Sequence, residues 1–322
     1  MLTITADNVN DAYNQALWTM KIHGKPSDSR NGKVLRVPSP VVTCYRYPTE
    51  RMLFDPTRDA NPYFHIFESI WMLAGRNDVA FPAKFAAQIY QYSDDGKTLS
   101  GAYGFRWRSH FEEDQLSWVI KHLKNNPSSR RAVITMWDGD TDPTLVENGT
   151  KDVPCNTGIY FSMRGKNLDM TVTNRSNDIV WGCYGANAVH MSMLQQFVAE
   201  ALGVHVGKYY QFSNDWHVYE QHFPLVYNAD TNQDLGLYPT GETSLVGGND
   251  WSKTLSLFDV WCSDPDQPFA HPYIRDTLVP MYTSWAAYKA GDREGAEDFA
   301  WKIKDGPIRV ACLGWLGRRA WK

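Results

Sequence analysis

The sequence predicts an α+β fold in one domain that spans residues 1–322. Three observations lead to this fold class. Several segments carry apolar residues at helical spacing, which is typical of amphipathic helices. Others are short runs rich in Val, Ile and aromatic residues, bounded by turn residues, which is typical of strands. No internal repeat, low-complexity tract or linker separates them, so a single layered domain is the simplest interpretation.

The N-terminal third begins with a helix and then changes to strands. Residues 7–22 place Ala12, Leu17 and other apolar side chains at helical spacing, and Asp7 or Asn8 is a plausible N-cap. Residues 26–32 are polar and end in a turn signal, so we expect a loop there. Residues 34–47 are rich in Val and predict one or two strands.

A strongly apolar helix is predicted for residues 62–73, and Glu68 interrupts its apolar pattern. A glutamate at that position is either on an exposed stripe or buried for a functional reason, and the pattern leaves both open.

The remaining elements follow from the same patterns, with polar loops at 138–153 and 224–251. We expect helices at 81–92, 114–124, 187–202, 273–290 and 294–304, a buried strand at 132–137, a hairpin of 158–163 with 168–174, and a strand at 208–214.

Composition restricts the class of protein. The net charge of −4 and the 43% apolar content indicate a soluble globule rather than a non-specific nucleic-acid binder. The five cysteines are scattered and form no metal-binding spacing, so we expect neither a disulfide framework nor a metal site, and a reducing cytoplasm suits them. No signal peptide or membrane span is expected.

Cys155 is the candidate nucleophile. It follows Pro154 and begins a strand next to a loop, although a lone cysteine is more often a small buried hydrophobe. If Arg175 approaches the thiol, the guanidinium favours the thiolate, which is the reactive form.

Several polar residues accompany the cysteine at the ends of predicted strands. The guanidinium groups of Arg30, Arg130, Arg131 and Arg175 could converge on a phosphate, and Ser176 could add a hydroxyl donor.

Three further side chains suit a nucleoside. Asn187 offers one donor and one acceptor, which matches the O4 and N3–H edge of uracil. His217 and Tyr219 alternate along one strand, so both side chains face the same side and could bind a sugar hydroxyl.

These residues lie in a series of motifs whose order is that of a known family. The chain resembles the family of thymidylate synthases and deoxypyrimidine nucleotide hydroxymethylases over roughly residues 7–225, whereas residues 225–322 form a divergent region of the same domain. The matching motifs are Arg30-x-Gly32, Glu68 within 65–75, Gly101-x-Tyr103-Gly104, the segment 114–131 that ends in Arg130-Arg131, Pro154-Cys155, Arg175-Ser-Asn-Asp178, Gly182 with Asn187, and Asp215-x-His217-x-Tyr219.

The resemblance implies a fold and an assembly. Members of this family have a large, mixed, twisted β-sheet packed with helices, and two copies pair sheet to sheet. It implies that Arg130 and Arg131 reach the phosphate site of the neighbouring subunit, while Arg30, Arg175 and Ser176 hold the 5′-phosphate within their own subunit.

The resemblance also implies a reaction. The Cys155 thiolate would add to C6 of a deoxypyrimidine monophosphate, and C5 would then accept a one-carbon unit from 5,10-methylenetetrahydrofolate. Glu68 would move protons through ordered water, Tyr103 would assist removal of the C5 proton, and Asp178 would contact the pterin of the folate.

Three departures from the methyl-forming members favour a hydroxymethyl product. Asn156 follows the nucleophile where those enzymes carry histidine, residues 318–322 do not form a short apolar tail, and residues 87–92 lack an evident counterpart of a shielding tryptophan. Trp181 before Gly182 is closer to hydroxymethylases of bacteriophages, which would place the protein in the cytoplasm of the host. Methyl transfer, which would make it a thymidylate synthase, remains the alternative.

The base is uracil or cytosine, depending on one position. An ungapped comparison places Ala186 at the base-reading position, whereas the start of the helix at 187 favours Asn187, which suits uracil. Two other classes of function stay open: a Cys-His hydrolase that uses Cys155 with His217 or His222, and a non-catalytic nucleotide or RNA binder.

Overall fold

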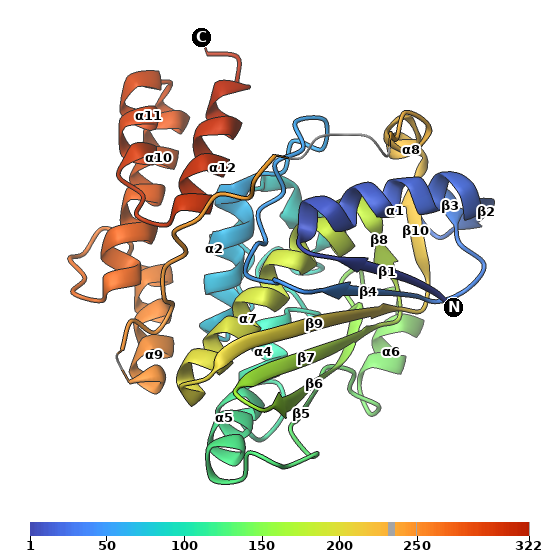
Figure 1. The fold of residues 1–322 in the computed structure, drawn as a ribbon, viewed down its shortest axis with the longest axis horizontal. Helices are drawn as coiled ribbons and strands as arrows, with labels where there is room; N and C mark the ends of the chain where they lie inside the picture. Colours follow the sequence, from blue (N-terminus) through green and yellow to red (C-terminus); the bar gives the residue numbers. More distant parts are fainter. Residues whose placement is uncertain (231–235, 249, 322) are drawn as a thin grey trace.

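The computed structural model describes residues 1–230, 236–248 and 250–321. Its centre is a mixed sheet of six strands (Figure 1). Across the sheet the strands are β1 (Leu2–Ala6), β4 (Val41–Tyr45), β9 (His205–Ser213), β7 (Asn167–Asn174), β6 (Asn156–Arg164) and β5 (Val133–Thr135). The pairs β1–β4 and β7–β9 are parallel, and the other neighbours are antiparallel.

A second, smaller sheet lies at one end of the first. Its order is β2 (Lys25–Ser29), β3 (Gly32–Arg36), β10 (Trp216–Tyr219) and β8 (Asn177–Asp178). Strand β8 follows β7 closely and β10 follows β9, so the two sheets share a corner where chain segments around residues 175 and 215 meet.

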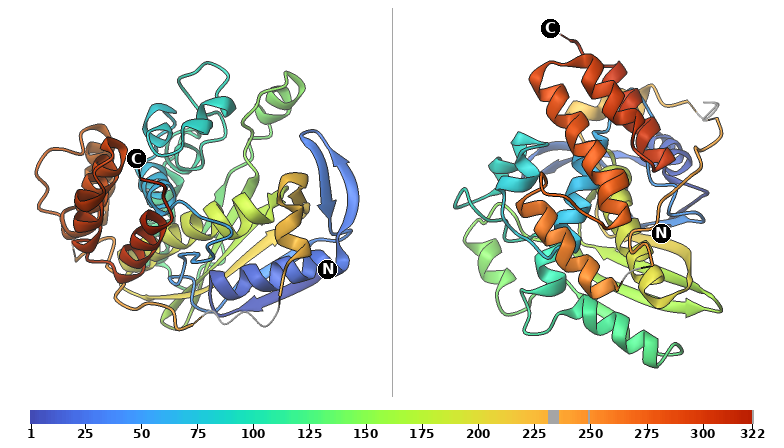
Figure 2. Two further views of the ribbon diagram at one scale, coloured as in Figure 1. Left: turned by 90° about the horizontal axis from the view of Figure 1, so that it is seen from above. Right: turned by 90° about the vertical axis from the view of Figure 1, so that its left-hand side faces the viewer.

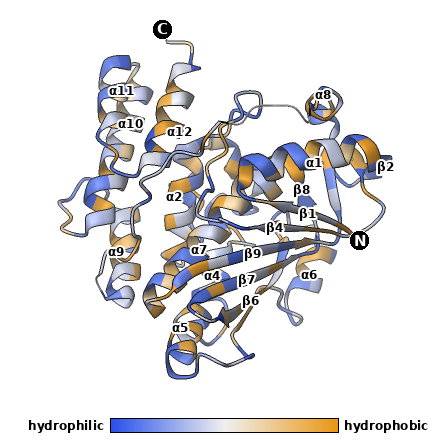
Figure 3. Cartoon of the chain, in the orientation of Figure 1, coloured by the Kyte–Doolittle hydropathy of each residue, from blue (hydrophilic) through white to orange (hydrophobic). Residues whose placement is uncertain are grey.

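Two helices form the central layer. Helix α2 (Pro62–Leu73) packs against α7 (Asn187–Leu202), and every residue of α2 is buried. Most of its residues are apolar, and hydrophobic colouring recurs along α2 in Figure 3. A helix that is apolar on all sides lies inside a protein, which explains why the charged Glu68 within it needs a specific environment.

The C-terminal helices cover the outer side of α2. They are α9 (Trp251–Ser263), α10 (Val279–Ala290), α11 (Arg293–Trp301) and α12 (Gly306–Gly317), and Figures 1 and 2 show them as one group beside α2. The Tyr63 ring contacts Trp285 and Trp315, with centroids 5.3 and 5.6 Å away. The C-terminal helices thus complete the core around α2.

The other helices surround the sheets. They are α1 (Val9–His23), α3 (Ala80–Ala83), the 3-10 helix η1 (Ala87–Tyr92), α4 (Tyr103–Arg108), α5 (Gln115–Asn125), α6 (Asp142–Glu147), the π-helix η2 (Ile179–Ala186), the 3-10 helix η3 (Glu220–His222), α8 (Phe223–Tyr227) and the π-helix η4 (Ile274–Leu278).

Most predicted elements are confirmed, and several details are corrected. The helix at 62–73 and the helix at 187–202 have the predicted bounds, and Asn8 is the N-cap of α1. The predicted loop at 26–32 is instead strand β2 with the turn into β3, because its polar residues form an edge of the small sheet where both faces are largely exposed.

Helices were missed within the predicted loops. Helix α6 lies in 138–153, and α8 begins at Phe223 and extends into 224–251, a stretch that also includes undescribed residues. Helices α9 and α12 were not predicted, and the helix expected at 81–92 is two short helices. In the part of the chain that the structure describes, no helix has the length and apolar character needed to cross a membrane.

Candidate active site

Cys155 lies directly before β6, and Arg175 lies directly after β7. Because β6 and β7 are antiparallel neighbours, their ends bring these two residues together. The Arg175 side chain donates from Nε to the carbonyl of Pro154 and from Nη2 to the carbonyl of Val153, each at 2.9 Å. Its backbone N–H donates to the Cys155 carbonyl, also at 2.9 Å. The guanidinium therefore holds the loop that presents the half-buried thiol.

Opposing effects act on the Cys155 thiol. Burial raises its pKa above the ordinary value, and Arg175 and Arg30 act in the opposite direction as nearby positive charges. Asp152 raises the pKa further. The two arginines thus keep the pKa of the thiol lower than burial alone would make it.

Tyr103 lies beside the thiol, at the first residue of α4. Burial holds the pKa of its phenol well above the usual range, and Cys155 and Asp152 act in the same direction. The hydroxyl therefore stays protonated at neutral pH. Gly104 follows it because the helix touches α2 at this point: a Cβ on Gly104 would overlap the Met72 carbonyl.

Glu68 is buried in the middle of α2, and it faces His190 of α7. The distance from Glu68 Oε2 to His190 Nε2 is 3.0 Å. Of the two interpretations of Glu68 that the sequence allows, the structure supports the buried one.

Asn187 opens α7 directly after the π-helix η2. A π-helical turn holds more residues than an α-helical turn, so η2 accommodates an extra residue before α7 starts. The Asn187 Nδ2 donates to Asn177 Oδ1 at 3.2 Å, and Gly182 leaves room beside both amides. Asn177 is itself held by Gln211 and Ser213.

Asp178 begins η2 as its N-cap and accepts hydrogen bonds from the backbone N–H groups of Val180 and Trp181. The Trp181 side chain keeps 37% of its surface exposed. The Arg58 guanidinium lies 5.5 Å from the centre of its ring, and the Phe64 ring centroid is 6.0 Å away. An exposed indole beside a carboxylate is a surface on which a flat ring could stack.

The small sheet carries His217, Tyr219 and Arg30. His217 Nδ1 lies 2.9 Å from Asp215 Oδ1, and its ring is 5.1 Å from that of Tyr219. Burial raises the pKa of Tyr219, and Asp178 and Cys155 are near enough to act in the same direction. Arg30 occupies the β2–β3 turn and is exposed. These residues therefore surround the same region as the thiol.

Arg130 and Arg131 are separate from that group. Both are exposed in the segment between α5 and β5, at the edge of the large sheet, and their side chains make no hydrogen bond or ion pair among the described residues. Ser176 lies between β7 and β8, half-buried, next to Arg175.

Three features of this site were not predicted. Asp152 accepts the Gly101 N–H at 2.8 Å and lies within electrostatic range of Cys155, Tyr103 and Glu68. His190 was hidden in the apolar pattern of α7, and the pairing of Arg58 with Trp181 joins distant segments. Only Asp152 had a signal in the sequence, because it stands three residues before the nucleophile.

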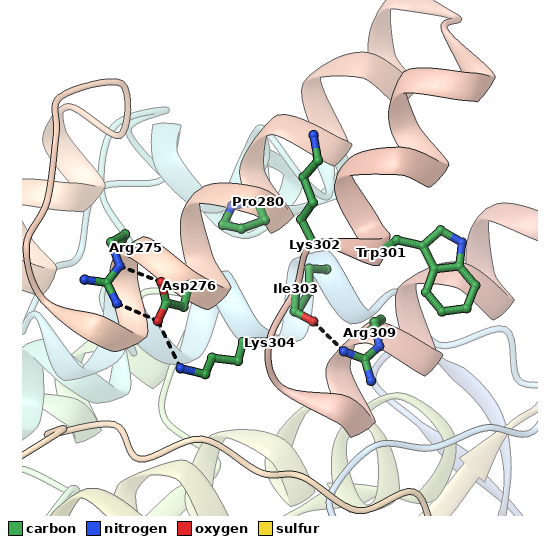
Figure 4. Close-up of a pocket in the computed structure, with 8 residues that line it drawn as sticks. All are labelled: Arg275, Asp276, Pro280, Trp301, Lys302, Ile303, Lys304 and Arg309. Carbon is green, nitrogen blue, oxygen red and sulfur yellow. Dashed lines mark hydrogen bonds and ion pairs between the residues drawn. The ribbon is translucent and has the colours of Figure 1, made fainter.

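A hollow lies far from these residues along the chain, among the C-terminal helices (Figure 4). It measures about 390 Å³ and is lined by Arg275, Asp276, Lys304 and Arg309 among others. Arg275 and Lys304 both pair with Asp276, and Arg309 donates to the Ile303 carbonyl. The Asp276 carboxylate therefore offsets part of the positive charge that lines the hollow.

Comparisons with known proteins agree with this arrangement. The family model for thymidylate synthase matches residues 11–238. A deoxyuridylate hydroxymethyltransferase of Pseudomonas phage M6 is 42% identical over 341 residues, covering 99% of this chain and 95% of that protein. One of Bacillus phage SP01 is 34% identical, covering 74% of this chain and 64% of that protein. A putative thymidylate synthase of Methanothermobacter thermautotrophicus is 38% identical over 131 residues, covering 41% of this chain and 56% of that protein.

Proposed function

Because the chain belongs to the thymidylate synthase family, we propose that it is a deoxyuridylate hydroxymethylase, which adds a one-carbon unit to C5 of dUMP and releases 5-hydroxymethyl-dUMP. The observation that carries this proposal is the position of Cys155. Its half-buried thiol lies where Arg175, Tyr103 and Asp152 meet, so one nucleophile is surrounded by a cation, a protonated phenol and a carboxyl group.

The first step of the proposed reaction is addition of the Cys155 sulfur to C6 of the base. This step needs the thiolate, and the dianionic phosphate of the nucleotide needs cations. Arg30 and Arg175 serve the phosphate from the same subunit, and the hydroxyl of Ser176 adds a donor. His217 and Tyr219 on β10 bind the sugar, since both side chains border the region around Cys155.

Asn187 is proposed to select uracil. Its Nδ2 already donates to Asn177, whereas its Oδ1 has no hydrogen bond among the described residues and is not sealed from solvent. A free carbonyl can accept the N3–H of uracil, and cytosine has no proton at N3. The π-helix η2 supports Asn187 over Ala186, because it accounts for the one-residue offset between this chain and the family pattern.

The proposed co-substrate is 5,10-methylenetetrahydrofolate, which supplies the one-carbon unit at the oxidation level of formaldehyde. The exposed Trp181 ring beside Asp178 suits a pterin, since an aromatic face and a carboxylate complement a flat ring that bears N–H donors. No metal is part of the proposal.

We further propose that two copies pair through the face of the large sheet that its helices leave open. On this face Val133, Tyr160, Thr171 and Tyr210 form one cross-strand row. Val133 is 37% exposed and Tyr160 is 46% exposed, which is unusual for large apolar side chains in a sheet. Arg130 and Arg131 stand at the β5 edge of this face, from which they reach the phosphate site of the partner copy.

The product distinguishes this proposal from thymidylate synthesis. Purified protein is incubated with dUMP and methylenetetrahydrofolate, the nucleotide is identified by mass spectrometry, and formation of dihydrofolate is followed by absorbance. We expect 5-hydroxymethyl-dUMP with no oxidation of the folate. A methyl product with stoichiometric dihydrofolate would instead identify a thymidylate synthase. Cys155→Ser is expected to abolish turnover.

The Cys-His hydrolase and the non-catalytic binder have less support. The groups that act most strongly on the Cys155 thiol are Arg175, Asp152 and Arg30, and neither His217 nor His222 is among them. A non-catalytic binder would bind dUMP but release no proton from C5, so release of tritium from [5-³H]dUMP separates it from the enzyme.

A further inference from the structure

Glu68 and His190 form a buried pair in which each is the other's only polar side-chain partner among the described residues. The two atoms are 3.0 Å apart, and the side chains keep only 11% and 2% of their surface exposed. Apart from Glu68, His190 Nε2 has no partner, and its contact with Glu68 falls outside ideal hydrogen-bond alignment. Neither oxygen of Glu68 is fully sealed from solvent, so a water molecule can approach the carboxylate.

The pair is built by two helices whose inner faces also carry other groups of the site. His190 lies one turn after Asn187, so both project from the same face of α7. One turn before Glu68 on α2 is His65, whose ring centroid lies 6.3 Å from that of His190. The helix face that presents Asn187 to the base therefore also fixes the partner of Glu68.

The surroundings leave His190 as the natural donor to this carboxylate. Burial and the positive charge of Arg58 hold the pKa of His65 well below its usual range, so His65 remains neutral. Asp152, the other carboxyl group in electrostatic range of Glu68, is an acceptor when ionised. Among the described residues, His65 and Asp152 lie near the pair, and Arg58 acts on it through its position beside His65.

We propose that His190 is a positioning residue for Glu68 in the step that adds water to the nucleotide. His190 Nε2–H donates to one carboxylate oxygen and leaves the other free to take a proton from water. The water oxygen then bonds to the methylene carbon on C5, and the electron pair of the C5–methylene double bond moves towards the C4 oxygen. Return of that pair restores the C5–C6 double bond and expels the Cys155 thiolate.

This inference rests on the proposed function, and the first measurement separates the two. If the parent protein forms no 5-hydroxymethyl-dUMP, the proposed function fails, whatever His190 does. With the parent active, His190→Ala is compared with His190→Gln, whose amide N–H can replace the imidazole donor. His271→Gln, a change at a buried histidine of the C-terminal region, is the control for folding.

Two rates are measured for each variant: release of tritium from C5, which reports the early steps, and formation of the hydroxymethyl product. For His190→Ala we expect product formation to fall about 10-fold or more, with tritium release within about 3-fold of the parent. His190→Gln should recover most of the loss. An equal fall in both rates, or a fall in neither, would overturn the proposal.

A double variant keeps the proposal testable if His190→Ala does not fold. Because His190 acts through Glu68, Glu68→Gln combined with His190→Leu, which removes the donor but keeps most of the side-chain volume, should be no slower than Glu68→Gln alone. Losses that multiply would show that His190 acts independently of Glu68, and would refute the assignment.

Discussion

At the scale of single residues, the reactivity of Cys155 depends on a balance between burial and charge. Burial raises the pKa of the thiol, and Arg175 opposes that effect while it holds the carbonyls of Val153 and Pro154. The sequence indicated that Arg175 would matter for the thiol. It could not indicate the strength of burial, because solvent exposure depends on segments far away in the chain.

Arg175→Ala should slow alkylation of Cys155 by iodoacetamide about 3- to 10-fold at pH 8, because the thiol pKa rises when the cation is lost. Mass spectrometry of the modified peptide as a function of pH gives this rate. Arg164→Ala removes an exposed arginine from the far end of β6 and is the matched control. An unchanged rate in Arg175→Ala would contradict this account of the thiol.

Asp152→Asn should stabilise the protein at neutral pH relative to acidic pH. Burial raises the pKa of Asp152 from 3.8 to about 6, so the folded chain keeps a proton that the unfolded chain has already lost. The contribution of this carboxyl to stability is therefore fully present below about pH 4 and is lost as the pH rises through about 6. The free energy of unfolding of the variant, measured relative to that of the parent, is expected to be ~1–2 kcal/mol more favourable at pH 7.5 than at pH 4.

Thermal unfolding at the two pH values checks the Asp152 prediction, with Asp140→Asn as the control at an exposed carboxyl. A difference between variant and parent that does not change with pH would be inconsistent with a raised pKa at Asp152.

Asn187→Asp should move substrate preference towards dCMP. An aspartate that is protonated, or that turns its oxygen to the base, can accept the N4–H of cytosine, and it loses the donor that now contacts Asn177. We expect the ratio of kcat/KM for dCMP over dUMP to rise at least about 10-fold. Asn187→Ala should weaken both substrates without that shift, and an unchanged ratio in Asn187→Asp would refute the placement of Asn187 at the base.

At the scale of secondary structure, close contacts between helices determine where the active groups lie. The contact between α4 and α2 sets the position of Tyr103 relative to the helix that carries Glu68. Gly104 permits this contact because it has no side chain. A Cβ at this position would lie 1.9 Å from the Met72 carbonyl oxygen and would overlap it. In the sequence this glycine is only part of a motif, whereas the fold explains why a residue without a side chain is needed there.

Gly104→Ala should therefore destabilise the protein by at least about 3 kcal/mol, because backbone on the facing helix cannot move aside. Urea unfolding measures this change. Gly139→Ala is the matched control, since a Cβ at Gly139 meets nothing within 4 Å. If Gly104→Ala unfolds like the control, the contact between α4 and α2 is looser than described.

At the scale of the whole molecule, the open face of the large sheet and the position of Arg131 lead to a prediction about assembly. If each site takes Cys155 from one subunit and Arg131 from the other, two inactive variants can restore each other. Cys155→Ser and Arg131→Ala subunits, mixed after reversible dissociation, should recover about a quarter of the parent activity, because half of the dimers are mixed and each holds one intact site.

Controls for the mixing experiment are each variant dissociated and reassociated alone, together with the molar mass of the parent from light scattering. A monomeric parent, or a mixture no more active than Arg131→Ala alone, would contradict the shared site.

The sequence by itself determined the elements with strong periodicity and the chemical types in the site. Helices α2 and α7 and the β6–β7 hairpin depend mainly on local patterns of apolar residues, and Cys155, Arg175 and Asn187 belong to motifs that lie close together along the chain. Such features can be predicted without knowledge of distant contacts, because the helical and strand periods are properties of the local backbone.

Only the tertiary structure decided which of those residues share an environment. The contact of Glu68 with His190, the raised pKa of Asp152 and the separation of Arg130 and Arg131 from Arg30 depend on how α2, α7 and the two sheets pack. Helices α9 and α12 were missed for the same reason, because their stability comes from partners distant in sequence and burial by such partners has no periodic signature in the chain. Edge strand β2 pairs with the strand that follows it, and it was missed because its residues are polar and lack the apolar alternation of a half-buried strand.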